Sequence, residues 1–287
     1  MKTKNLLATA LIAAVAFTSC DKSEDVGDLR KEVKIVASVG ALTGNQTRAS
    51  FQSDGSGEFE VGDEYVLNTY SPTLSSEARY QYEIGSTTLY WDEVSPDGSP
   101  VDFNAWYPVY NFFMGSPIRS YKVATAGTED AKDLLMTPKV SVAKYNQVNL
   151  QFKHVMHKLT VVLSSNYYTP AQLNSATITL RNLKSDAMVD FNNGTVDKTA
   201  ASGTDAYPSE TGSRAEFVVA PQTLTAGTEI IEIVIDAKIY FYEVPAILTA
   251  LESGQTLTLS LNLKQGGGVT GTIGEDFTPG GGHGGWN

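Results

Sequence analysis

Three histidines are the first residues that could do chemistry in this 287-residue chain. His154 and His157 stand three apart in a segment with strand-like alternation, and an odd spacing on a strand sends two side chains to opposite faces. They cannot share one metal ion unless the backbone bends there, so we expect one to be packed and the other solvated. His283 lies in a glycine-rich tail as a lone ligand. The histidines therefore predict no metal site.

Motifs for hydrolysis and nucleotide binding are also missing from the sequence. It contains no HExxH, no GxSxG and no GxxxxGK, and its glycine clusters lack the strand-before, helix-after context of a phosphate loop. The acidic pairs Asp92-Glu93 and Glu275-Asp276 have the neighbours of solvated loops. An enzyme of a surface polysaccharide system would need converging carboxylates, which this pattern does not supply. We expect no catalysis and no cofactor.

The single cysteine, Cys20, offers chemistry of another kind. Lys2 and Lys4 precede an apolar run from Leu6 to Phe17, which suits a secretory signal and is shorter than the roughly 20 residues of a membrane span. The junction resembles the lipobox of bacterial lipoproteins, which implies acylation of the Cys20 thiol and an outer-membrane anchor. A plain cleaved signal is the alternative, although no second cysteine exists for pairing.

The negative charge of the chain excludes some classes of binding partner. The formal net charge is -11, and loss of Lys2 and Lys4 with the signal removes two positive charges to leave -13. Such a chain repels nucleic-acid phosphates and anionic headgroups, so we expect no nucleic-acid partner. The acidic stretch 21–28 resembles the export tag of lipoproteins displayed on the surface of Bacteroidia.

Period-two alternation predicts that strands build most of the chain. The first strand, within residues 31–42, carries Val33, Ile35, Ala37 and Val39 on one face. Further strands are expected in FEVGDEYVL, STTLYWDE, VDFNAWYPV, QVNLQFKHVMHKLTVVLSS, SATITLRNL, RAEFVVAPQ, EIIEIVID, KIYFYEV and QTLTLSLNLK, with helical turns at TEDAKDLL and TPAQLNSA. Many short strands with turns between them predict an all-β protein built from β-sandwiches.

A change of strand parity marks the expected domain crossing. Val148 and Phe152 share one parity, whereas Leu159 and Leu163 share the other. A strand cannot change its inward face without a bulge, a bend or a switch of sheet, so we place the crossing near residues 146–158. The predicted organisation is a signal (1–20), an N-terminal domain (21–150), a C-terminal domain (151–265) and a glycine-rich tail (266–287).

Several segments, in order, resemble the fimbrillin family, the subunits of type V pili of Bacteroidia. They are the lipobox at Cys20, TRAS followed by FEVGD, YWDE then VDFNAWYP, DLLMTP, VNLQFKHVMHKLTV, VVAPQTL and LESGQTLTLSLNL. They cover nearly the whole chain after the signal. The resemblance implies two transthyretin-like β-sandwich domains in tandem, a location at the cell surface, and other fimbrial subunits as partners through β-strand exchange.

The resemblance also implies a route of assembly. In such pilins an Arg-specific protease cuts the loop after the first strand, and a strand from a neighbouring subunit fills the groove left behind. The matching position is Arg48, which would give a new N-terminus at Ala49; Arg79, Arg119 and Arg214 also lie in polar sequence but do not follow the first strand. Four apolar residues at about 1.5–3 kcal/mol each suggest that about 6–10 kcal/mol of burial leaves with the strand, as an upper bound. The removable strand comprises Val33, Ile35, Ala37 and Val39.

The candidate donor strand lies in the C-terminal tail. Val269, Ile273 and Phe277 share a parity there, but Gly271 and Glu275 interrupt the face. This pattern favours a subunit that caps, tips or anchors a fimbria, or a tail that docks on its own domain.

A cluster of aromatic residues supports an alternative function. The aromatic platform would comprise Tyr90, Trp91, Trp106, Tyr107, Phe112 and Phe113, which either pack between strands or bind sugar rings. A monomeric surface lipoprotein that binds glycan or host protein would expose Trp91 or Trp106.

Overall fold

The computed structural model describes residues 30–40, 50–51, 57–109, 116–123 and 133–274. The chain divides into two compact units, Met1–Arg30 and Lys31–Asn287. Arg30 belongs to the first unit, and every element described below belongs to the second.

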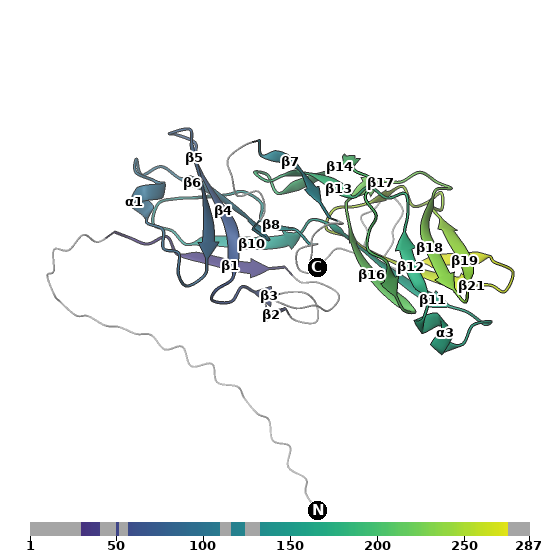
Figure 1. The fold of residues 1–287 in the computed structure, drawn as a ribbon. Helices are drawn as coiled ribbons and strands as arrows, with labels where there is room; N and C mark the ends of the chain where they lie inside the picture. The colour runs from purple at the N-terminus through teal and green to yellow at the C-terminus, as the bar shows by residue number, and fades with distance from the viewer. Residues whose placement is uncertain (1–29, 41–49, 52–56, 110–115, 124–132, 275–287) are drawn as a thin grey trace, which may run out of the picture. The chain divides into compact units, whose positions relative to one another are not determined.

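The second unit is almost entirely β-structure, as predicted (Figure 1). In the described residues, its largest sheet has the order β2-β3-β1-β10-β8-β6-β4-β5, with β9 paired to β6. These strands are β1 (Ile35–Val39), β2 (Ser50–Phe51), β3 (Gly57–Glu58), β4 (Glu64–Ser71), β5 (Ser76–Glu83), β6 (Val101–Tyr107), β8 (Leu135–Met136), β9 (Val140–Val142) and β10 (Val148–His154).

Two further sheets contain most of the remaining strands. One has the order β16-β11-β21-β22, and the other has the order β15-β12-β18-β19. Their strands are β11 (His157–Ser164), β12 (Thr177–Leu180), β15 (Glu210–Thr211), β16 (Arg214–Val219), β18 (Glu229–Ile235), β19 (Lys238–Glu243), β21 (Thr256–Leu263) and β22 (Val269–Ile273). The cleanest predicted strand, β21, buries Leu257, Leu259, Leu261 and Leu263.

Two smaller sheets contain the other described strands. One has the order β14-β13-β7, from β7 (Ile118–Lys122), β13 (Asp186–Asp190) and β14 (Thr195–Ser202). The other pairs β17 (Gln222–Thr223) with β20 (Ala250–Leu251). Since β7 pairs with β13, hydrogen bonds join a segment before residue 150 to one after it. The division at that residue therefore stays a prediction.

Short helices interrupt the strands. The helix α3 (Pro170–Asn174) confirms the turn expected at TPAQLNSA: Thr169 and Gln172 form a reciprocal capping box, and Pro170 occupies the first turn, where a missing N–H costs nothing. The prediction of a strand at STTLYWDE is wrong. Its last residues begin the helix α1 (Trp91–Val94), which buries Trp91 and Val94 at helical spacing. The polar stretch before it contains β5, which was not predicted.

The predicted crossing near 146–158 is a switch of sheet. β10 ends at His154 in the largest sheet, and β11 begins at His157 beside β16 and β21. The turn that precedes β21 holds this crossing, because Gly254 N donates to Met156 O (3.0 Å) and Ser253 Oγ donates to Val155 O (2.8 Å). The parity change is therefore explained by a switch of sheet, one of the three causes that the sequence left open.

Among the described residues, the core consists of two hydrophobic clusters. The N-terminal cluster, as we call it, includes Tyr65, Phe103 and Phe152, with residues of β1 packed against them. The second cluster is formed mostly by strands after residue 155 but also takes in Trp106. Because side chains alternate along β6, Phe103 and Trp106 enter different clusters.

Candidate functional site

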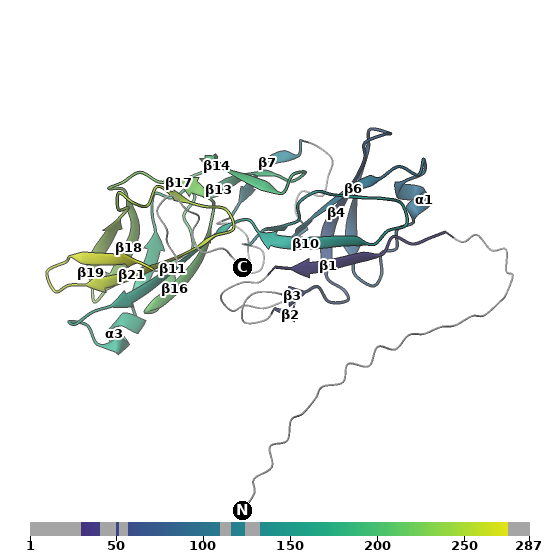
Figure 2. The ribbon, with the colours of Figure 1, turned by 180° about the vertical axis from the view of Figure 1, so that it is seen from behind.

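The predicted removable strand lies inside a sheet. β1 runs parallel to β10, from Ile35 opposite Val148 to Val39 opposite Phe152, and its last residues also pair with β3. Figures 1 and 2 show β1 and β10 side by side from opposite directions. Loss of β1 would leave the ladder edge of β10 without its neighbour, which is the kind of edge that recruits another strand.

One face of β1, together with Val33 just before it, contacts the N-terminal cluster. Val33 and Val39 are 6% and 4% exposed, and Ile35 and Ala37 are partly buried. Val36 points the other way and is 49% exposed. Because two of the four inward side chains are only partly buried, we place the apolar burial at about 5 kcal/mol, below the range expected from sequence.

A main-chain clasp, residues 89–91, holds the segment before β1. Val33 N donates to Leu89 O (2.8 Å), Trp91 N donates to Lys31 O (2.9 Å), and Glu32 bridges to Tyr90. Sequence reasoning missed this contact, since YWDE was expected to continue as a strand. The spacing of the apolar Trp91 and Val94 was the available signal for a helical turn.

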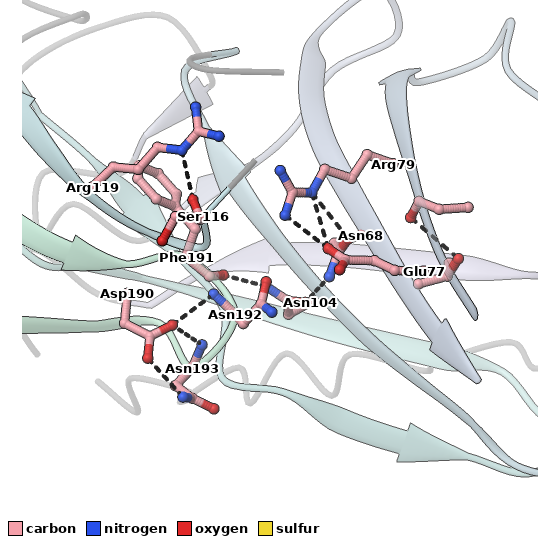
Figure 3. Close-up of polar contacts among 12 residues, drawn as sticks. Asn68, Glu77, Arg79, Asn104, Ser116, Arg119, Asp190, Phe191, Asn192 and Asn193 are labelled. Atoms are coloured by element: carbon pink, nitrogen blue, oxygen red, sulfur yellow. Dashed lines mark hydrogen bonds and ion pairs between the residues drawn. The ribbon is translucent and has the colours of Figure 1, made fainter. Parts of the chain in front are cut away.

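Arg79 is enclosed by its neighbours and is a poor protease site (Figure 3). It lies in the middle of β5, opposite Asn68 of β4, and its side chain is 5% exposed. Its guanidinium donates to Glu77 Oε1 from Nη2 (2.8 Å) and Nε (3.1 Å) and lies 5.7 Å from the Trp106 ring. Proteases prefer exposed loop tips, so the polar sequence around Arg79 was misleading.

The same polar network joins strands to a distant turn. Asn68 Nδ2 donates to Asn104 Oδ1 (3.0 Å), and Asn104 Nδ2 donates to the carbonyl of Phe191. Both asparagines are buried. Asp190 Oδ1 accepts a hydrogen bond from the backbone N–H of Asn192 (3.0 Å). Figure 3 shows Asp190 and Asn192 on either side of Phe191, next to Asn104. We assign the network a structural role, since its buried amides are paired to one another and to backbone.

The backbone of each other described arginine in the second unit is also paired with a neighbouring strand. Arg119 lies in β7 opposite Val189, and its Nε donates to Ser116 O (2.6 Å). Arg214 lies in β16 opposite Val162. Arg181 follows β12 directly, and its N donates to Ile230 O (2.9 Å).

The candidate donor strand is docked within its own chain. β22 pairs antiparallel with β21, and Val269 and Ile273 pack partly against the second cluster. Gly271 does not break this packing: a Cβ there would lie 2.3 Å from Cε2 of Tyr242, so the glycine makes room for that ring. Among the described strands, β22 has only β21 as a ladder neighbour.

The two central histidines are both buried, so the expectation of one packed and one solvated is wrong. His154 is 5% and His157 0% exposed. His154 Nδ1 pairs with Asp133, whereas His157 Nδ1 contacts Glu252 O at 2.9 Å. Alternation does not apply across them because the chain changes sheet between them. Across the described segments, no group of three or more His, Cys, Asp or Glu could hold a metal ion.

The two tryptophans of the aromatic platform are not available for sugar binding. Trp91 and Trp106 are each 1% exposed, with Trp91 against Phe103 and Trp106 against Phe191. Tyr90 and Tyr107 are half-buried. The tryptophans therefore belong to the core, and the prediction of exposed tryptophans for a glycan-binding lipoprotein is contradicted.

Some predicted site residues lie outside the described residues. These are Cys20, Arg48, Ala49, Phe112, Phe113 and Phe277. No described helix is long and apolar enough to cross a membrane.

Comparisons with known proteins agree with the fold. A family model described as fimbrillin-like matches residues 36–275. A candidate cell adhesion protein from Bacteroides uniformis has a TM-score of 0.62 at 17% identity, covering 85% of this chain and 97% of its own. One from Bacteroides ovatus has a TM-score of 0.61 at 18% identity, with 86% and 97% covered. No curated protein matches significantly.

Proposed function

Because the chain belongs to the fimbrillin-like family, we propose that it is a structural and adhesive subunit of a cell-surface fimbria, assembled by β-strand exchange. Membership of the family places it among fimbrial and adhesive proteins of the cell surface. The strand exchange, the lipid on Cys20 and the absence of catalysis are parts of the proposal.

The observation that carries the proposal is the position of β1. It supplies inward apolar residues and a full ladder to β10 without lying in a hairpin with that strand. A strand joined to its neighbour only through a long connection can leave without pulling that neighbour with it. Its removal would expose the edge of β10 and the apolar residues beneath it, which suits β-augmentation by another chain.

The accessibility of the arginines supports Arg48 as the cut site. Arg79, Arg119 and Arg214 lie within paired strands, where the backbone is not free to enter a protease cleft. Arg48 lies between β1 and β2, and cleavage before Ala49 would separate β1 from the rest of the chain. Arg30, before the clasp, is the competing position, and a cut there would leave β1 in place.

The tail is the proposed source of the donor strand. β22 is short, and its inward residues are only partly buried. Release of Val269 and Ile273 costs little apolar burial, and Phe277 would extend the same face. β22 is therefore held less strongly by apolar burial against its own sheet than β1 is against the N-terminal cluster.

Limited digestion tests the proposal. Residues 21–287, which lack the signal and Cys20, would be treated with an Arg-specific protease and followed by N-terminal sequencing and gel filtration in detergent. We expect an N-terminus at Ala49 and detergent-resistant oligomers. Arg48→Gln should abolish both, whereas Arg30→Gln should keep them.

The outcomes separate the alternatives. A cut at Ala49 without oligomers would indicate a terminal subunit that needs a different partner. No cut at Arg48, or loss of the whole fold on cutting, would contradict strand exchange and favour a monomeric surface lipoprotein.

A further inference from the structure

A cavity lies at the end of β12, far along the chain from β1. Its volume is about 470 Å³, and its walls come from residues 179–184 and 204–207. This volume lies in the range of small-molecule sites, roughly 300–1,000 Å³. The first lining segment is the end of β12 with the start of its connection to β13, and the second is the stretch that follows β14.

The buried lining of the cavity is apolar and fixed. Leu180, Leu183 and Tyr207 line it and are each at most 5% exposed. The Tyr207 hydroxyl donates to Lys184 O (2.6 Å) and accepts from Ala220 N (3.1 Å). Since both contacts are to backbone, the hydroxyl and its ring are anchored before any ligand arrives.

The backbone around the cavity is held in place as well. Asn182 has a left-handed φ of 54°, and its side-chain amide donates to Glu229 O at 2.8 Å. Lys184 N donates to Gln222 Oε1 (2.8 Å). Such a preformed site loses little entropy when it binds.

Gly203 allows the second lining segment to approach the first. Its φ is 77°, and a Cβ there would lie 2.4 Å from Ser185 Oγ. Only glycine fits this close approach, which places residues 204–207 against the connection from β12 to β13.

Charged groups surround the apolar lining. Arg181 pairs with Glu232 and lies 5.6 Å from the Phe241 ring, and Asp205 pairs with Lys122. Lys184 lines the cavity and has no ion pair within the described part of the chain. Lys184 is therefore the lining cation that no other described residue engages in an ion pair, with the Asp186 carboxylate close to Tyr207 of the same lining.

We propose that this cavity binds a sugar residue that carries a carboxylate, of the uronic or sialic acid type. The Lys184 ammonium would take the carboxylate, and the apolar lining would receive the C–H face of the ring. The Asp205 carboxylate would accept hydrogen bonds from the ring hydroxyls, since its side chain is still 51% exposed, and the Thr204 hydroxyl could accept from or donate to them. The Asp205 carboxylate disfavours a dianionic phosphate but suits a monoanion with hydroxyl donors.

Calorimetry on uncut residues 21–287 tests this site. The probes are N-acetylneuraminic acid and methyl glucuronide, with methyl glucoside as the neutral control. We expect saturable binding of at least one acidic sugar and at least tenfold weaker binding of the glucoside. Lys184→Gln should weaken acidic-sugar binding at least tenfold. Lys153→Gln, an exposed lysine on β10 in another sheet, should leave it unchanged.

Three results would overturn the proposal. They are no saturable binding of either acidic sugar, equal affinity for the neutral sugar, or unchanged binding by Lys184→Gln. Thermal unfolding of each variant checks that it is folded. Since the protein is uncut and no subunit partner is present, these results do not depend on strand exchange.

Discussion

Val39 and Val36 offer a direct test of how strongly β1 is held. Both valines lie in the same strand, yet Val39 is 4% and Val36 is 49% exposed. Val39→Ala removes two buried methyl groups and leaves a small cavity, which should cost about 2 kcal/mol. Val36→Ala changes strand propensity equally, but the Val36 side chain is half exposed and points away from the N-terminal cluster, so its cost should stay within about 0.5 kcal/mol.

Urea unfolding would measure the difference. Tryptophan emission is a suitable probe because Trp91 is buried in the same cluster as Val39. With a slope of about 3 kcal/mol/M, Val39→Ala should lower the midpoint by about 0.7 M and Val36→Ala by less than about 0.2 M. Equal shifts would mean that β1 contributes only local propensity, and the argument for an apolar groove beneath it would fail.

Three further predictions follow from glycine geometry and a buried phenol. Gly271→Ala should lift β22 from the sheet, because the new methyl meets the Tyr242 ring; amide exchange over residues 269–273 should become faster. Gly254→Ala should destabilise the fold by about 2–3 kcal/mol in urea unfolding, because its φ is 67° and a Cβ would lie 2.8 Å from His154 O. Burial raises the pKa of Tyr207 above 10.0, so its contribution to stability is complete below pH 10 and is lost as pH rises further; thermal unfolding from pH 9 to 11 should show a falling midpoint.

Each of these predictions has a control. Gly227→Ala also occupies a left-handed position, at φ 80°, but its Cβ meets nothing within 4 Å, so it should cost only about 1 kcal/mol. Equal costs at the two glycines would refute the clash at Gly254. Unchanged amide exchange in Gly271→Ala would mean that the Tyr242 ring moves aside for the new methyl group, so that the glycine is not required for the packing of β22. The alkaline loss should be less steep in Tyr207→Phe, and an identical slope would rule out Tyr207 as its source.

Strands with one wet face and one dry face were predictable from the sequence. β10 and β21 alternate without interruption, and the parity change between β10 and β11 located the switch of sheet. β5 was missed although Ala78, Tyr80 and Tyr82 alternate with polar or charged residues. Both of its faces are mostly half-buried, so its composition looked like that of a polar loop.

The missed features depend on contacts between distant segments. The clasp needs residues 89–91 beside the start of β1, and the cavity needs residues 204–207 beside residues 179–184. The sequence favoured a core position for Trp91 and Trp106, since adjacent aromatics must split between the faces of a strand, but left the sugar platform open because sequence gives composition and not exposure. His154 and His157 were misassigned because alternation was extended across a break in the strand.

The parallel pairing of β1 has a consequence for the order of folding. Ile35 meets Val148, so the first strand to be synthesised must wait until more than a third of the remaining chain has been made before its partner exists. Closing so long a loop is slower than forming the hairpin of β4 and β5. We therefore expect β1 to dock late, and every newly made molecule passes through an interval in which the edge of β10 is uncovered. During that interval, β1 and a strand from another chain compete for the edge of β10. Which of them binds first depends on the local concentration of the tethered β1, rather than on its intrinsic affinity.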